Sequence, residues 1–270
     1  MKLLFLGDVV GRAGRTALSV RLRQLRGLLE LDFIVANGEN AAHGFGITPK
    51  ICGELFDAGV DCITTGNHIW DRAEINDTLD REPRLLRPQN YGSNRPGRGF
   101  AIYETPRGQR IAVLNVMGRL FMDEVSDPFA CVDETLAALR LGQDATAILV
   151  DIHAEATSEK VAIGHYCDGR ATLVVGTHSH IPTADCRVLP RGTAYQTDAG
   201  MCGDYDSVIG MRKSASLDRF LGRRSPDRLE PAEGPATLCG VFVELDDRTG
   251  LAKRAAPLRL GGDLANQWPF

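Results

Sequence analysis

The sequence lacks the features of a membrane, secreted or nucleic-acid-coating protein. None of its apolar runs approaches the roughly 18 residues that a membrane-spanning helix needs. Its first residues reach Asp8 and Arg12 too early for the apolar core of a secretory signal. It has no excess of basic residues either, because 31 Lys and Arg stand against 35 Asp and Glu, a net charge of −4. We therefore expect a cytoplasmic protein that neither enters a membrane nor binds nucleic acid stably.

Cysteine pairs at metal-binding or redox spacing are also absent. The seven cysteines are odd in number and widely spaced, and no Cys-x-x-Cys pair occurs. This pattern excludes a zinc finger and a disulfide framework. We expect most of the cysteines to be small buried hydrophobic residues.

The composition is that of an ordinary globular protein. Of the 270 residues, 43% are hydrophobic and 24% are charged, and a chain of this length can bury a large core without disulfides or structural metals. The sequence contains no internal repeat, no low-complexity tract and no strong linker. We expect one domain over residues 1–270.

Short apolar runs typical of buried strands alternate with helical patterns along the chain. The predicted strands are 2–7, 33–38, 61–66, 110–116, 146–152, 172–176, 194–197, 238–246 and 254–260. The predicted helices are a segment after Gly14 with Leu18, Leu22, Leu25 and Leu29 on one face, then 48–58, 129–141 and 158–166. Long loops are expected at 81–99 and 222–235. This order predicts an α/β protein with a mostly parallel first half and a more antiparallel end.

Side chains that bind metals follow five of the predicted strands. They are Asp8, Glu39, Asn40, Asn67, His68, His153, His178 and His180. In an open α/β sheet the ligand crevice lies beyond the carboxyl ends of the strands, so we expect these side chains to converge. Any one of them could instead be a helix cap or a turn residue, but their recurrence at five strand ends indicates one common site.

The donor set indicates a pair of metal ions. Two carboxylates drawn into one crevice repel each other, and no Lys or Arg lies in the immediate cluster to offset their charge. Imidazole, carboxylate and amide groups suit Zn, Fe, Mn or Co, and the absence of thiolates argues against a purely structural zinc. Without His68, the set still has seven members. Seven ligands are too many for one catalytic ion, but they divide well between two ions about 3.5–4 Å apart that share a carboxylate.

The motifs resemble those of a known enzyme family. GD at 7–8, GEN at 38–40, GNH at 66–68, His153 and GTHSH at 176–180 follow the order of the calcineurin-like metallophosphoesterase signature. Two motifs depart from it, because the usual DxH opening is Asp8-Val9-Val10 and the usual second GD is GEN. These departures, with GDVVGRAGR, ANGENAAHGFGIT, TTGNHIWD, NVMGR and YQTDAGMCGDYDSVIGM, resemble the bacterial YmdB-like subfamily from Met1 to about Met211, and more loosely beyond.

The resemblance implies the four-layer α-β-β-α sandwich of these enzymes and two divalent or trivalent metal ions, with Fe or Mn favoured and Zn also compatible. Asn40 would supply the ligand that the valine at position 10 cannot. Glu39 would bridge the ions. The first ion would be held by Asp8, Glu39, Asn40 and His180, and the second by Glu39, Asn67, His153 and His178.

The implied activity is hydrolysis of cyclic nucleotides, especially 2′,3′-cyclic nucleotides. A hydroxide bridging the two metals would attack phosphorus in line. His68 would act as general acid and protonate the departing ribose oxygen. The substrate would therefore be a small cyclic nucleotide or another phosphodiester. Members of the subfamily form oligomers, so a homo-oligomer is expected too.

Three further residues are candidates for substrate contact. His43 lies in the glycine-rich AAHGFG segment, Asn115 ends a predicted strand, and Arg12 lies near a helix start, where anions are favoured. Each also has a structural interpretation, as a turn residue, a cap or a solvated arginine. Asp198 and Asp204 are expected to hold the loop beside His180.

Three alternatives remain open at this stage. An amidohydrolase on a TIM barrel also places His and Asp at strand ends, but its His-x-His typically comes first, whereas here it comes late. A regulatory protein could bind a nucleotide without turnover. A metal-dependent hydrolase could act on a different phosphoester.

Overall fold

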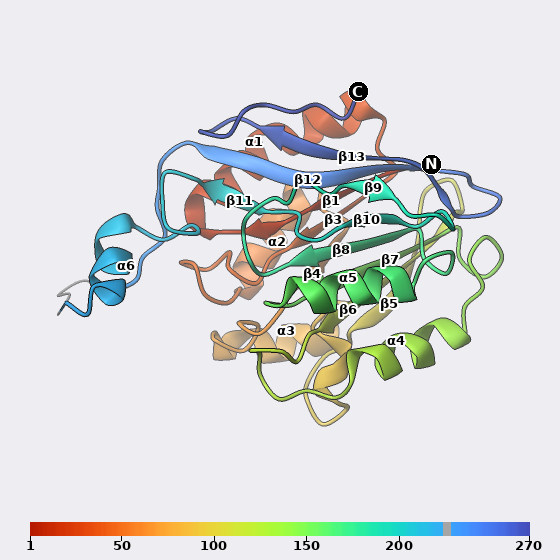
Figure 1. The fold of residues 1–270 in the computed structure, drawn as a ribbon, viewed down its shortest axis with the longest axis horizontal. Coiled ribbons are helices and arrows are strands. Elements are labelled where there is room, and N and C mark those ends of the chain that lie inside the picture. Colours follow the sequence, from red (N-terminus) through yellow and green to blue (C-terminus); the bar gives the residue numbers. More distant parts are fainter. Residues whose placement is uncertain (224–227) are drawn as a thin grey trace.

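Two β-sheets packed face to face form the centre of the computed structural model, which describes residues 1–223 and 228–270 (Figure 1). The first sheet has the strand order β2 (Asp8–Val9), β11 (Met201–Asp204), β12 (Ala236–Leu245), β1 (Lys2–Leu6), β3 (Phe33–Asn37) and β4 (Cys62–Thr64), and β13 (Ala252–Leu260) pairs with β12. The second has the order β5 (Phe100–Glu104), β6 (Arg110–Met117), β7 (Ala147–His153), β8 (Leu173–Thr177), β10 (Ala194–Gln196) and β9 (Arg187–Val188).

Each sheet has a parallel centre. Strands β1, β3 and β4 run parallel in the first sheet, and β6, β7, β8 and β10 run parallel in the second. Strands β12 and β13 pair antiparallel with each other, and β12 pairs antiparallel with β1. The predicted change from parallel pairing to antiparallel pairing toward the end of the chain is confirmed.

Helices cover the outer face of each sheet, which confirms the four layers (Figure 1). Helices α1 (Gly11–Leu29) and α2 (Pro49–Ala58) pack on the first sheet. Helices α4 (Pro128–Ala137) and α5 (Thr157–Tyr166) pack on the second. The remaining helices are α3 (Asn76–Arg81) and α6 (Lys213–Phe220), with the 3-10 turns η1 (Ala73–Ile75) and η2 (Gln89–Tyr91).

The alternation of side chains along β1 shows how the sequence builds these layers. Leu3 and Phe5 belong to the core between the sheets, whereas Leu4 and Leu6 belong to the core beneath the helices. Successive residues of a strand point to opposite faces, so an all-apolar strand must be covered on both sides. The resulting three cores exclude the barrel alternative, because the described strands form two separate sheets.

The two N-terminal helices follow their sequence signals. The four leucines predicted to share one face of α1 are all buried. In α2 the hydroxyl of Thr48 accepts from the amide of Ile51 at 3.2 Å, Pro49 occupies the first turn, and Gly59 ends the helix in the left-handed conformation.

The structure differs from prediction in several elements. The strand predicted at 2–7 stops at Leu6, and Asp8–Val9 leaves β1 to pair with β11 instead. The helix predicted at 129–141 ends at Ala137. The predicted loop at 81–99 contains η2, and the one at 222–235 lies partly outside the described residues. In the described parts of the chain, no helix is both long and apolar enough to cross a membrane.

Candidate active site

Both sheets contribute side chains to one cluster at the carboxyl ends of their strands. Asp8 begins β2, Glu39 follows β3 and Asn67 follows β4 in the first sheet. His153 ends β7, and the turn after β8 carries His178 in the second sheet. Because the sheets face each other, their strand ends meet, and ligands from residue 8 to residue 180 come within reach of one another.

The tightest group consists of Glu39, His153 and His178. Their potential ligand atoms all lie within 4.8 Å of one another. His153 Nε2 is 3.0 Å from Glu39 Oε1 and 3.1 Å from His178 Nδ1. The amide oxygen of Asn67 lies 3.0 Å from the same His153 nitrogen. These four residues are the set predicted to surround one ion.

A second group lies beside the first. His180 Nε2 is 3.3 Å from Asn40 Oδ1 and 3.9 Å from Asp8 Oδ1. Asp8 Oδ1 is also 4.0 Å from His153 Nδ1, and Asp8 Oδ2 accepts from the amide of His178 at 3.2 Å. Asp8 thus lies between the two groups.

The donor atoms fit metal ions. Asp8 is fully buried, yet its Oδ1 has no hydrogen-bond partner. A buried carboxylate oxygen without a partner is costly, and a cation at this position would satisfy it. Among the described residues, no Lys or Arg forms an ion pair with Asp8 or Glu39. Imidazole nitrogens, carboxylates and amide oxygens are ligands for Fe, Mn and Zn.

Neighbouring groups fix the orientation of two imidazoles of the cluster, those of His153 and His180. His153 Nδ1 lies 2.9 Å from the hydroxyl of Thr177, which donates to Asp151 Oδ1 at 2.7 Å. His180 Nδ1 lies 2.8 Å from the carbonyl oxygen of Ile209. In both rings the Nδ1 side is therefore occupied, and Nε2 is the nitrogen that faces the cluster and could bind a metal.

A polar network buried between the sheets supports the site and was missed by the sequence analysis. The Asn37 side chain donates to Asp151 Oδ2 at 3.2 Å and accepts from the amide of Glu39 at 3.1 Å. These side chains are buried, and Asp151 interrupts the apolar strand β7. Polar residues inside otherwise apolar strands could have predicted this network, because polar side chains are rarely buried without hydrogen-bond partners.

Burial and mutual charge shift the pKa values of the cluster. Burial opposes ionisation of Glu39, but the nearby imidazole of His153 outweighs it and lowers the pKa of Glu39 to about 2. Burial acts against the charged form of His153 too, yet Glu39 and Asp8 raise its pKa to about 9. Burial and the charge of His153 lower the pKa of His178 to about 3. Without a metal, His153 is therefore the group that carries the positive charge.

The turn after β8 is held in a strained conformation. His178 and His180 have φ values of 94° and 64°, in a region that side chains other than glycine seldom adopt. Asp198 holds this turn, as expected, by accepting from the amide of Ser179 at 3.1 Å and from its hydroxyl at 2.7 Å. Asp204, expected to do the same, instead accepts from the backbone amides of residues 206 and 234. Such strain, of order 1–3 kcal/mol per residue, is typical of functional sites.

His68 lies at the edge of the cluster. Its amide donates to Glu39 Oε2 at 3.1 Å, and its ring Nδ1 lies 2.8 Å from Asp71 Oδ2. The Phe45 ring contacts it edge to face, with centroids 5.2 Å apart. The side chain is partly exposed, so its Nε2 side is the one available to a substrate.

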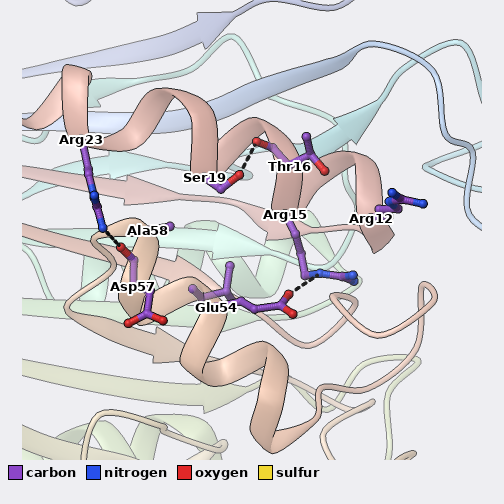
Figure 2. Close-up of a pocket in the computed structure, with 9 residues that line it drawn as sticks. Arg12, Arg15, Thr16, Ser19, Arg23, Glu54, Asp57 and Ala58 are labelled. Carbon is purple, nitrogen blue, oxygen red and sulfur yellow. Dashed lines mark hydrogen bonds and ion pairs between the residues drawn. The ribbon is translucent and has the colours of Figure 1, made fainter.

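The three predicted substrate contacts occupy different environments. Asn115 is fully buried, and its side chain accepts from the amide of Thr65 at 3.1 Å. His43 is exposed in the loop after Asn40 and has a φ of 55°. Arg12 lines a cavity of about 570 Å³ between α1 and α2 (Figure 2), and none of the candidate metal ligands lines it.

The fold is that of the calcineurin-like phosphoesterases. The solved structure of the calcineurin-like phosphoesterase YfkN from Bacillus subtilis superposes with a TM-score of 0.54 at 11% identity, over 97% of this chain and 90% of the other. This likeness shows the fold.

The chain belongs to the YmdB-like protein family, whose model matches residues 4–258. It is 45% identical to the 2′,3′-cyclic-nucleotide 2′-phosphodiesterase of Bacillus subtilis, over 97% of this chain and 98% of that protein. A structure described as a novel phosphatase from Mycoplasma pneumoniae has a TM-score of 0.89 and 35% identity, over 97% of this chain and 94% of the other. The chain is thus an enzyme of phosphoester hydrolysis.

Proposed function

We propose that this enzyme hydrolyses 2′,3′-cyclic nucleotides with the help of two metal ions. The observation that carries the proposal is the convergence of Asp8, Glu39 and His153, with an unpartnered carboxylate oxygen at its centre. The name of the Bacillus subtilis relative supports the substrate class. That name also supports breakage of the bond to the 2′ oxygen, which would leave a nucleoside 3′-monophosphate.

The seven donor residues divide between two ions. Glu39 is the bridging ligand in this proposal, as the family resemblance implies. Asp8, whose Oδ1 lies 4.0 Å from His153 and 3.9 Å from His180, is placed between the two groups. Asp8, Asn40 and His180 would complete one ion's set, and Asn67, His153 and His178 the other's. When bound, the ions supply Lewis-acid polarisation of the phosphoryl group and activation of water near neutral pH. Fe or Mn fits the donors best, and Zn is also compatible.

His68 is the general acid of the proposed reaction. Asp71 holds Nδ1 of the ring, so the proton that can be delivered to a leaving oxygen resides on Nε2. Its amide bond to Glu39 keeps the ring at the border of the metal site. A positioned histidine of this kind contributes about 10²–10⁴ in rate.

The proposed setting is cytoplasmic, with small cyclic nucleotides as substrates and no stable nucleic-acid or membrane partner. The charge balance supports the absence of a nucleic-acid partner, since acidic residues outnumber basic ones. A homo-oligomer of a single-domain chain is part of the same proposal.

The test is a substrate panel combined with elemental analysis. The purified enzyme should contain about two metal ions per chain and should convert 2′,3′-cyclic AMP to the 3′-monophosphate faster than it converts 3′,5′-cyclic AMP. Asp8→Asn should lose most of the metal and nearly all turnover, whereas Asp263→Asn, at an exposed position, should lose neither.

Two outcomes would contradict the proposal. Saturable nucleotide binding without turnover by the metal-loaded protein would indicate a regulatory binding module. Turnover of other phosphoesters, with none of any 2′,3′-cyclic nucleotide, would assign a different substrate to the same site.

A further inference from the structure

The loop of residues 118–126, between β6 and α4, begins beside a proposed metal ligand. Met117, the last residue of β6, lies opposite His153 in the register of the second sheet. The next amide, that of Gly118, donates to the His153 carbonyl oxygen at 3.0 Å. The loop therefore leaves the sheet beside the end of β7, which carries His153.

Two buried polar side chains hold the ends of this loop. The carboxylate of Glu159 accepts from the backbone amides of Arg119 at 3.0 Å and Leu120 at 3.3 Å. The amide of Asn90 donates to the carbonyl oxygens of Met117 at 2.7 Å and Ser126 at 2.9 Å. Such side-chain bonds to backbone groups fix the course of a loop, so its tip is presented in a defined position.

An aromatic side chain stands at the exposed part of the loop. Phe121 is 90% exposed and has a φ of 63°. A left-handed backbone is unfavourable for a bulky residue. An exposed phenyl ring also lacks the hydrophobic stabilisation that a buried one provides. Neither the left-handed backbone nor the exposed ring stabilises the fold, which indicates that Phe121 has a functional role.

Aromatic residues link this loop to the proposed acid. The hydroxyl of Tyr91 donates to Asp123 Oδ2, in the loop, at 3.0 Å. The Tyr91 ring meets the edge of the Trp70 ring, with centroids 4.6 Å apart. Trp70 follows His68 by two residues. A chain of contacts therefore runs from the loop, through Tyr91 and Trp70, to the segment that carries His68.

The metal-binding residues themselves cannot recognise a nucleobase. Their carboxylates, amides and imidazoles would bind the metal ions, and the metal ions would bind the phosphate. Recognition of the base must come from groups beyond them, and the commonest means is stacking on an exposed aromatic ring, because every base has a π face.

We propose that Phe121 is a specificity-determining residue that stacks on the nucleobase of the substrate. The inference rests on the proposed function, since only a nucleotide substrate presents a base. The cyclic phosphate would occupy the metal site, and the base would lie toward loop 118–126. Stacking is sequence-tolerant, so the residue would favour base-bearing substrates generally, with the larger purines ahead of pyrimidines.

The test compares substrates with and without a base. Phe121→Ala should raise KM for 2′,3′-cyclic AMP about tenfold and leave kcat unchanged, in line with the loss of one stacking contact. KM for ribose 2′,3′-cyclic phosphate, which has no base, should not change. Phe220→Ala, which removes another exposed phenyl ring from the projecting helix α6, is the matched control and should change neither (Figure 1).

Two further variants separate recognition from folding. Phe121→Gly relieves the left-handed backbone, so it should fold at least as well as the wild type and still show the raised KM. Phe121→Tyr should restore a KM close to that of the wild type. Equal KM for cyclic AMP in wild type, Phe121→Ala and Phe121→Gly would overturn the inference alone. Failure of the wild-type enzyme to hydrolyse any 2′,3′-cyclic nucleotide would instead overturn the proposed function.

Discussion

Lys160 and Asp198 form an ion pair that is wholly enclosed by the protein. The Lys160 ammonium, on α5, donates to Asp198 Oδ2 at 2.8 Å, and neither side chain is exposed. The same carboxylate accepts from Ser179, the residue between His178 and His180. The pair thus ties a helix of the second sheet to the strained turn that carries two proposed metal ligands.

Replacing this lysine should affect stability and metal binding together. Lys160→Met leaves Asp198 charged, buried and unpaired, so we expect a loss of about 3–5 kcal/mol in the free energy of unfolding. Metal affinity should fall about 10–100-fold, as for loss of a group that supports metal ligands. Chemical denaturation and metal titration would measure the two effects.

Lys50→Met is the control, because Lys50 lies on α2 with 87% of its side chain exposed. It should leave both quantities near those of the wild type. If Lys160→Met folds and binds metal with wild-type affinity, the pair does not position the turn.

His68 and the metal ligands should respond differently to mutation. His68→Ala should lower kcat about 10²–10⁴-fold while the metal content stays unchanged, because no metal-binding atom is removed. Asp71→Asn should lower kcat less, since it disturbs only the orientation of the ring. Elemental analysis and steady-state kinetics on the same samples would separate these effects.

His165→Ala, at an exposed position on α5, provides the control for loss of an imidazole. Loss of a metal ion from His68→Ala would show instead that His68 is a ligand and that another group must donate the proton.

The ion pair between Glu39 and His153 should stabilise the metal-free enzyme most in mildly acidic solution. Glu39 has its pKa lowered from 4.5 to about 2, so its contribution to stability is lost as the pH falls through that interval. His153 has its pKa raised from 6.5 to about 9, so its contribution is lost as the pH rises through that interval. From these two groups, the free energy of unfolding should be highest between pH 4.5 and 6.5.

Bound metal should reverse the alkaline part of this profile, because His153 must lose its proton to become a ligand. Denaturation across the pH range, with and without added Mn²⁺, would show the difference. Stability of the metal-free enzyme that kept rising up to pH 9 would contradict the ion pair between His153 and Glu39.

The cysteines should resist modification while the protein is folded. All seven are free thiols, and five are buried, as expected from the sequence. Burial raises the pKa of the Cys52 and Cys62 thiols from 9.0 to about 12, so little reactive thiolate forms at mildly alkaline pH. Mass spectrometry after brief alkylation should find few adducts on the native protein and seven on the unfolded one. Rapid native labelling of Cys62 would contradict its burial.

The strand ends were predictable from sequence because each joins an apolar run to a side chain of a type that can bind metal. The grouping of strands into two sheets was not, because β1 and β7 are equally apolar and nothing local says which strands pair. The break between β1 and β2 was missed for a related reason: Gly7 continues the apolar run, but a side chain there would meet the Gly200 carbonyl oxygen at 1.8 Å. Long-range contact, and not local propensity, ends that strand.

Supporting residues were harder to predict than ligands. Asn37 and Asp151 lie inside strands, and their partners are distant in sequence. Strand β5 was missed because its residues are half-exposed and show no clear apolar alternation. Helix α6 has few buried residues, so it lacks the apolar face that marks a helix in sequence.

The ligands' division between the two sheets has a mechanical consequence. Asp8 and Glu39 belong to one sheet, and His153 and His178 belong to the other. A cation bound by all four would therefore link the two sheets at one edge of the sandwich. Removal of the metal should then loosen that edge and speed amide hydrogen exchange at the carboxyl ends of β3, β7 and β8. The amino ends of the same strands should keep their protection. Binding of metal at the proposed site and stabilisation of the contact between the two sheets would then occur together.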